Sequence, residues 1–133
     1  MFSLTVADHI MIAHSFKGAE FGPAQRLHGA TYTVEAEFRA EKLDHLNLLI
    51  DIGLAKTELR RILDSVDYHN LDTLPALAGQ NTTTEYMAYH IHTLLAQACR
   101  NGALGDAGRK VSGLKVLLRE SPLAWAAYEG PIA

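Results

Sequence analysis

Alternation of apolar and polar residues predicts a half-buried strand over residues 26–39. One face would carry His28, Ala30, Tyr32, Val34, Ala36 and Phe38, and the other mostly Thr, Glu and Gly. Because successive side chains of a strand point to opposite faces, this strand should cover a core on one side only. Residues 3–14 favour a preceding strand, and the glycines and proline of residues 17–25 predict a loop between the two.

Two shorter apolar segments predict further strands. Residues 48–52 are expected to return as a third strand after a polar hairpin connection at residues 40–47. Residues 114–119 are expected to form the fourth strand. The tail that follows, SPLAWAAYEGPIA, is interpreted as a short apolar ending.

Between these strands the apolar period changes to that of a helix. Apolar residues between 54 and 66 recur three or four positions apart, which predicts an amphipathic helix. A loop at 67–80 precedes a second helix, whose start matches a capping box, Thr82-x-x-Glu85, and whose end matches Asn101-Gly102. Residues 102–109 predict a glycine-rich loop.

The predicted order is therefore β-β-β-α-α-β. Separate runs of strands and helices favour an α+β fold, here a four-stranded antiparallel sheet with two helices on one face. A length of 133 residues suits a single domain covering residues 1–133. The other face of the sheet would need a partner, which indicates a homo-oligomer.

The amino-acid composition and net charge argue against several classes of protein. The 48% hydrophobic and 20% charged fractions are those of a globular protein with a core, and a net charge of −3 gives no electrostatic reason to expect nucleic acid or anionic lipid. A single cysteine, Cys99, excludes an internal disulfide and a cysteine-rich zinc module. No apolar run approaches the roughly 18 residues of a membrane span, and no signal peptide is recognisable. We therefore expect a cytoplasmic protein with no membrane partner.

Two histidines are the first candidates for chemistry. His14 and His28 each lie in a strand-like run, on either side of the glycine-containing loop. Imidazoles on neighbouring strands can converge on one metal or ligand, and they can equally be two half-buried structural histidines. The pattern alone leaves both readings open.

Six segments, in order along nearly the whole chain, carry a resemblance to a known family. They are IAHSF at 12–16, RLHGATYTVEAEF at 26–38, LIDIGLAKTEL at 49–59, VDYHNLD at 66–72, NTTTEYMA at 81–88 and LKVLLRES at 114–121. Together they resemble the 6-pyruvoyl-tetrahydropterin synthase and 6-carboxytetrahydropterin synthase family. The resemblance implies a tunnelling fold, in which the sheets of three subunits close into a barrel and two barrels stack, giving a trimer or hexamer.

The resemblance also implies a site for a small-molecule pterin. In the family, a zinc ion held by three histidines binds the substrate's side-chain oxygens, and a cysteine activated by an Asp-His pair moves protons. By position, His14 and His28 match zinc ligands and Asp67 matches the catalytic aspartate, followed by Tyr68 and His69. The pterin ring would be anchored by a glutamate, and the matching residues are Glu120, Thr83 and Glu85.

Three of the family's chemical groups are missing from this sequence. Ala30 occupies the third zinc position, Ala24 the nucleophile position, and Tyr68 the histidine position, with His69 one residue late. Two histidines should hold zinc more weakly than three, and Glu20 in the intervening loop is the first candidate for another ligand.

The sequence therefore predicts a pterin-binding relative of these synthases with altered or lost lyase chemistry. One alternative is an active lyase on dihydroneopterin triphosphate, or a related pterin, that uses substituted groups such as Glu20, His69 or Tyr68. Another is a non-enzymatic oligomeric scaffold. Two of the three pterin assignments also have a structural alternative: Glu85 as the third helical residue of its capping box, and Glu120 as a solvated strand end.

Overall fold

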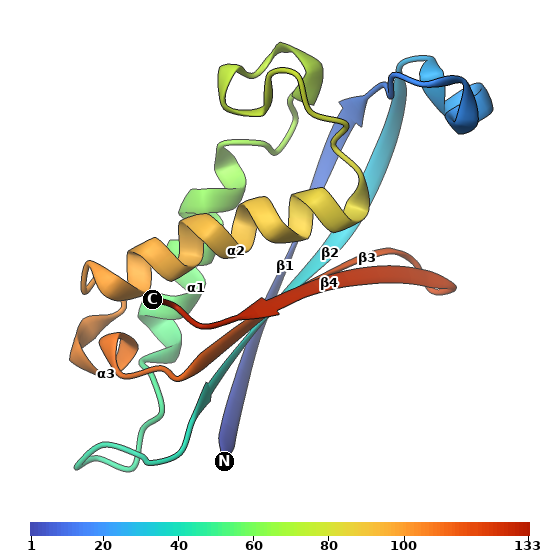
Figure 1. Ribbon diagram of the computed structural model, residues 1–133. Coiled ribbons are helices and arrows are strands. Elements are labelled where there is room, and N and C mark those ends of the chain that lie inside the picture. Colours follow the sequence, from blue (N-terminus) through green and yellow to red (C-terminus); the bar gives the residue numbers. More distant parts are fainter.

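The computed structural model describes residues 1–133 and contains a four-stranded antiparallel sheet with its helices on one face (Figure 1). The predicted α+β class is confirmed. The sheet has the order β1-β2-β3-β4, and its strands are Phe2–His14, His28–Ala40, Gly113–Ser121 and Ala124–Gly130. The helices are α1 (Ile52–Asp64), α2 (Thr84–Arg100) and the short α3 (Gly105–Arg109). Short 3-10 segments span Ala19–Gln25, which is kinked at Gly22, and Leu71–Thr73 and Pro75–Leu77.

The alternation predicted for the second strand is present in β2. Val34, Ala36 and Phe38 are fully buried beneath the helices, while the residues between them face outward. β1 pairs with β2 along its whole length, from Phe2 opposite Ala40 to the two histidines at the other end. The apolar face of this long ribbon and the apolar stripes of α1 and α2 form one core, because each would otherwise remain in water.

The prediction of a third strand at residues 48–52 is wrong. Leu49 and Ile50 are buried, but the segment is irregular and ends at Asp51, the N-cap of α1. The edge of β2 that it would have paired with is occupied by β3. The preceding residues form a compact turn and not a hairpin, because the Asp44 carboxylate accepts two main-chain N–H bonds within the loop.

The interpretation of the C-terminal tail as a short apolar ending is also wrong. β3 turns directly into β4, and residues 124–130 complete the sheet as its fourth strand. The tail then places Ile132 in the core, where its carbonyl accepts a hydrogen bond from Arg100 of α2. The observed order is thus β-β-α-α-β-β, with α3 inside the predicted glycine-rich loop.

The outer face of the sheet carries polar side chains that pair with one another. Arg39 contacts Glu37 at 2.6 Å and Glu129 at 3.0 Å, and the guanidinium of Arg119 lies 4.6 Å from the ring centroid of Trp125. No helix covers this face (Figure 1). None of the helices has the length and apolar character needed to cross a membrane.

The buried thiol of α2 offers a direct check of the core. Cys99 is fully buried, and this burial raises the pKa of its thiol to about 11. Since the thiolate is the reactive form, and only roughly 0.1% would be ionised at pH 8, we expect negligible labelling of the native protein by a thiol reagent. The same protein in concentrated urea should label fully. Rapid labelling under native conditions would contradict this packing of α2.

Candidate functional site

The structure brings His14 and His28 together at the end of the β1–β2 ribbon. They are direct partners in the strand register, and their ring centroids lie 4.6 Å apart. β1 ends at the first histidine and β2 begins at the second, so the whole intervening loop projects beyond the pair (Figure 1). Both side chains belong to the face of the sheet that the helices cover.

Both imidazoles are oriented through Nδ1. His28 donates from Nδ1 to the carbonyl of Arg26 at 2.8 Å, and Nδ1 of His14 lies 3.1 Å from Oγ1 of Thr82. This arrangement leaves Nε2 of each ring without a hydrogen-bond partner in the chain, as in histidines that bind metals through Nε2. Burial, and then the proximity of His28, lower the pKa of His14, which favours the neutral form that binds metals.

Thr82 had been assigned to a capping box, and that assignment is wrong. The N-cap of α2 is Thr83, whose hydroxyl accepts the N–H of Tyr86 at 3.2 Å. Thr82 is instead buried against His14. Glu85 becomes the second helical residue, so the capping role that competed with its ligand role is removed.

Two phenylalanines that sequence reasoning overlooked complete the surroundings of the pair. The Phe16 ring lies 4.6 Å from His14 and 5.6 Å from His28, and Phe21 packs on it at 4.9 Å. Both come from the segment between the two strands, in which only Glu20 had been considered as a ligand. The histidines therefore sit against an aromatic cluster.

The donor set of one chain does not fit a catalytic zinc ion. Ala30 lies on the same face as His28 but offers only a methyl group, and no third His, Cys, Asp or Glu joins the pair. Glu20 does not supply the missing ligand, because its carboxylate folds back over Gly18. We therefore assign no chemical step to a metal.

The segment predicted to hold the catalytic pair lies along the free edge of β1. The main-chain N–H of Tyr68 donates to Met11 at 2.7 Å, and that of Ala13 donates to His69 at 3.0 Å. The segment therefore runs beside the residues that lead to His14. Tyr68 has a positive φ of 58° and a side chain that is 81% exposed.

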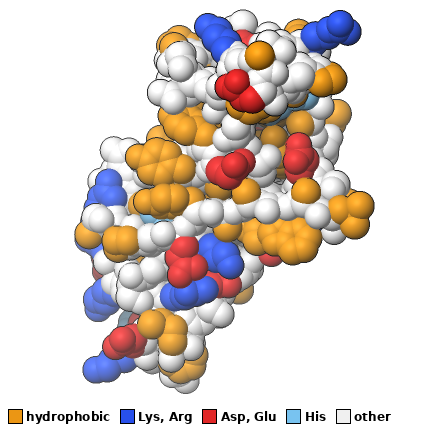
Figure 2. Space-filling model, turned by 45° about the vertical axis from the view of Figure 1, so that its right-hand side comes forward, with side chains coloured by type: hydrophobic (Ala, Val, Ile, Leu, Met, Phe, Trp, Pro, Cys, Tyr) orange, Lys and Arg blue, Asp and Glu red, His pale blue; other side chains and the backbone are white.

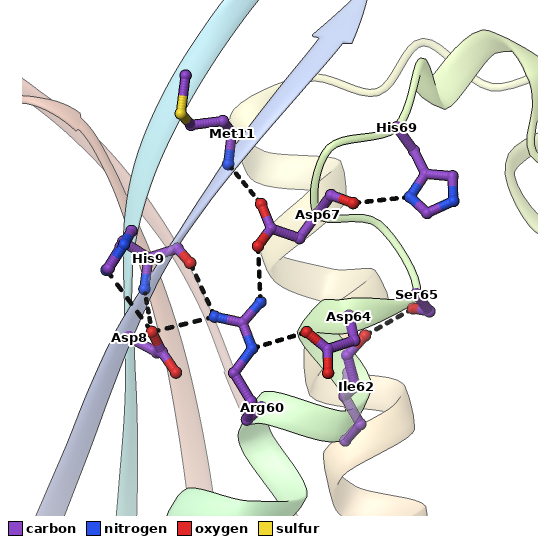
Figure 3. A network of polar contacts seen from close by, with 9 residues as sticks. All are labelled: Asp8, His9, Met11, Arg60, Ile62, Asp64, Ser65, Asp67 and His69. Carbon is purple, nitrogen blue, oxygen red and sulfur yellow. Dashed lines mark hydrogen bonds and ion pairs between the residues drawn. The ribbon is translucent and has the colours of Figure 1, made fainter.

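The carboxylate of Asp67 does not contact the ring of His69. One oxygen accepts the Met11 N–H at 2.9 Å, and the other pairs with Arg60 at 2.9 Å (Figure 3). His69 instead donates from Nδ1 to the Asp67 main-chain carbonyl at 2.7 Å. The ring lies on the side of the turn away from Arg60 (Figure 3).

The three residues matched to pterin binding lie around the start of α2 and the end of β3. Thr83 caps the helix, while Glu85 in its first turn and Glu120 near the end of β3 are both exposed. Burial raises the pKa of Tyr32, and the charges of Glu120 and Glu85 raise it further. Both carboxylates therefore lie within electrostatic reach of one phenol.

Tyr32 itself was missed as a candidate. It lies on the face of β2 that carries His28, and it is only 1% exposed. The alternation of β2 was the available signal, because it placed this hydroxyl on the same face as the histidine.

Comparisons with known proteins agree with this architecture. The model of the family described as 6-pyruvoyl tetrahydropterin synthase matches residues 3–131. A stretch of 45 residues is 38% identical to 6-carboxy-5,6,7,8-tetrahydropterin synthase of Helicobacter pylori; it covers 34% of this chain and only 22% of that protein.

Solved structures share the whole fold at low identity. The 6-pyruvoyl tetrahydropterin synthase of Caenorhabditis elegans superposes with a TM-score of 0.79 at 23% identity, covering 97% of this chain and 95% of that one. The corresponding enzyme of Plasmodium vivax gives a TM-score of 0.80 at 19% identity, covering 98% of each chain. These likenesses confirm that the single chain has the predicted tunnelling fold. Together with the match across residues 3–131, they show that the chain belongs to the 6-pyruvoyl tetrahydropterin synthase family.

Proposed function

We propose that this protein is a pterin-binding member of its family with altered or lost lyase chemistry. The observation that carries the proposal is the place of Glu120 in the sheet. It follows Arg119, the register partner of Thr33, and so lies beside the buried Tyr32 of β2, whose phenol pKa is raised first by burial and then by the charges of Glu120 and Glu85. The positions that would carry a nucleophile and a third metal ligand are, by contrast, Ala24 and Ala30.

The retained groups suit the pterin ring. A pterin presents a guanidine-like N–H edge, and an ionised carboxylate accepts two such hydrogen bonds in parallel. We assign this anchoring role to Glu120, with Thr83 and Glu85 as supporting contacts. Acidic side chains lie next to hydrophobic ones in the middle of the face drawn in Figure 2, the surroundings that a flat ring with one polar edge requires.

The remaining proton-transfer groups are those of the turn beside β1. Alanine cannot act as a base, and a tyrosine of ordinary pKa near 10 is a poor one at neutral pH. His69 is better suited, because its Nδ1–H bond to the Asp67 carbonyl leaves Nε2 as the acceptor. This contact favours one second candidate, an active lyase in which His69 moves protons at the substrate's side chain.

Assembly into a trimer or hexamer forms part of the proposal. The two edge strands of the sheet are β1 and β4, and the outer face has no helix over it. The larger hollows of one chain lie away from the histidines, such as the cavity of about 610 Å³ lined by Glu58, Arg61 and Leu94. A neighbouring subunit that closes the exposed site is consistent with both features.

Calorimetric titration of the purified protein with neopterin and with sepiapterin tests pterin binding. Glu120→Gln should weaken binding about 10- to 100-fold, because a hydrogen bond to a charged group contributes about 1.5–3 kcal/mol. Glu129→Gln is the matched control, since that glutamate pairs with Arg39 on the outer face. Absence of binding at millimolar ligand would remove the proposal and favour the scaffold alternative. Equal binding by the Glu120 variant would overturn the anchoring role assigned to Glu120.

Incubation with dihydroneopterin triphosphate separates the two catalytic possibilities. Product formation that His69→Gln abolishes would establish the active lyase. If the wild-type protein binds pterin and forms no product from dihydroneopterin triphosphate, the protein has lost the reaction on this substrate.

A further inference from the structure

Arg60 lies at the centre of a network that joins α1 to β1 and to the turn at residues 67–69. Its guanidinium contacts Asp8 at 3.1 Å, Asp64 at 2.8 Å and Asp67 at 2.9 Å, and it donates to the His9 carbonyl at 3.1 Å (Figure 3). The side chain of Asp67 is only 15% exposed. A planar guanidinium with five N–H donors can satisfy all of these acceptors at once, which a single ammonium group cannot do.

This network determines what the carboxylate of Asp67 can do. With one oxygen on the Met11 N–H and the other on Arg60, the carboxylate holds the turn against β1. It is therefore not the group that orients His69. That task falls to the main-chain carbonyl of Asp67, which accepts the His69 Nδ1–H at 2.7 Å.

The turn needs this external support because its conformation is unfavourable by itself. Tyr68 has φ 58°, a left-handed conformation that bulky side chains rarely adopt. Its ring is 81% exposed, so side-chain packing contributes little to holding it. The contacts that hold the turn include two main-chain bonds to β1, the bond of the Asp67 carboxylate to the Met11 N–H and the Asp67–Arg60 pair.

We propose that Arg60 is a positioning residue of the candidate site. By holding Asp67 on β1 it maintains the left-handed turn, and the turn holds His69 in one tautomer, protonated at Nδ1 and open at Nε2. The site thus uses an arginine and a peptide carbonyl where a carboxylate-histidine contact would otherwise orient the ring. The functional value of this arrangement rests on the proposed role of His69 in proton transfer.

Nuclear magnetic resonance of the full chain tests this proposal through two local readouts. The ring nitrogen shifts of His69 report its tautomer, and hydrogen exchange of the Tyr68 and Ala13 amides reports the docking of the turn. In Arg60→Ala we expect a mixture of tautomers and at least about tenfold faster exchange at both amides. Exchange in the middle of α2 should stay unchanged, which a general loss of stability would not allow.

Matched variants separate the network from a simple loss of charge. Arg61→Ala removes the neighbouring arginine, which pairs only with Glu58, and should leave both readouts as in the wild type. Arg60→Lys should restore part of the protection. If Arg60→Ala does not fold, Asp67→Asn is measured instead, because it retains an acceptor for Met11 and loses the ion pair. A single His69 tautomer and unchanged exchange in the folded variant would overturn the proposal.

Measurements on the same samples distinguish a failure of this proposal from a failure of the proposed function. Glu120→Gln should weaken sepiapterin binding and keep the His69 tautomer. Failure of the wild type to bind sepiapterin would count against pterin binding alone. Insensitivity of His69 to the loss of Arg60 would count against the positioning role alone.

Discussion

Replacing Ala30 by histidine is expected to turn the histidine pair into a zinc site. Residue 30 lies two positions after His28 on the same strand face, so the new imidazole would project beside the existing pair. His14 and His28 are already in contact, with their Nδ1 atoms hydrogen bonded and Nε2 without a hydrogen-bond partner in the chain. Three protein ligands are the usual complement of a catalytic zinc site.

Competition with a fluorescent zinc indicator at neutral pH would measure the gain. We expect Ala30→His to bind zinc more than about 100-fold more tightly than the wild type, because a direct ligand should exceed the roughly 10- to 100-fold effect of outer-shell partners. Thr31→His, on the exposed face, is the control and should change nothing. The gain should disappear when His14→Ala is added. Equal zinc affinity of Ala30→His and the wild type would show that the pair is not arranged for metal.

Phe38→Ala is expected to cause the largest loss of stability. Phe38 is fully buried in β2, the strand that lies between β1 and β3. Truncating a buried phenylalanine removes its transfer free energy and leaves a cavity, which together cost about 3–5 kcal/mol. This is a large share of the roughly 5–15 kcal/mol that stabilises a typical domain.

Urea unfolding followed by circular dichroism would measure this change. Phe2→Ala makes the same deletion at a residue that is 48% exposed, and should lower the free energy of unfolding far less. Similar losses for the two variants would mean that the apolar face of β2 is not the centre of the core.

Much of the fold could be predicted because its signals are local. The alternation of residues 26–39 and the helical periods that became α1 and α2 each reflect burial of one face of a single element. Tertiary contacts were needed for the remaining strands. Residues 48–52 and the tail are both apolar, and only the pairing of β3 with β2 decided which of them could join the sheet.

Some features of the candidate site could likewise be predicted from the sequence, and others depended on tertiary contacts. Residue order along the chain determined that His14 and His28 share a face with the core, that Ala24 and Ala30 lack the family's chemical groups, and that Glu120 and Glu85 are retained. The shared face follows from strand period, and the missing and retained groups follow from the resemblance of the sequence to the family. They do not depend on which distant segments come together.

Contacts between distant segments decided the rest. The contact of Thr82 with His14 joins residues 68 positions apart, and the contact of Asp67 with Met11 joins residues 56 positions apart. A carboxylate can accept bonds from any donor near it, so sequence order could not tell whether Asp67 would orient a histidine or bind Arg60. The sequence by itself determined which chemical groups the site of this protein has, and the tertiary structure decided which partners those groups have, because hydrogen bonds depend on proximity in space.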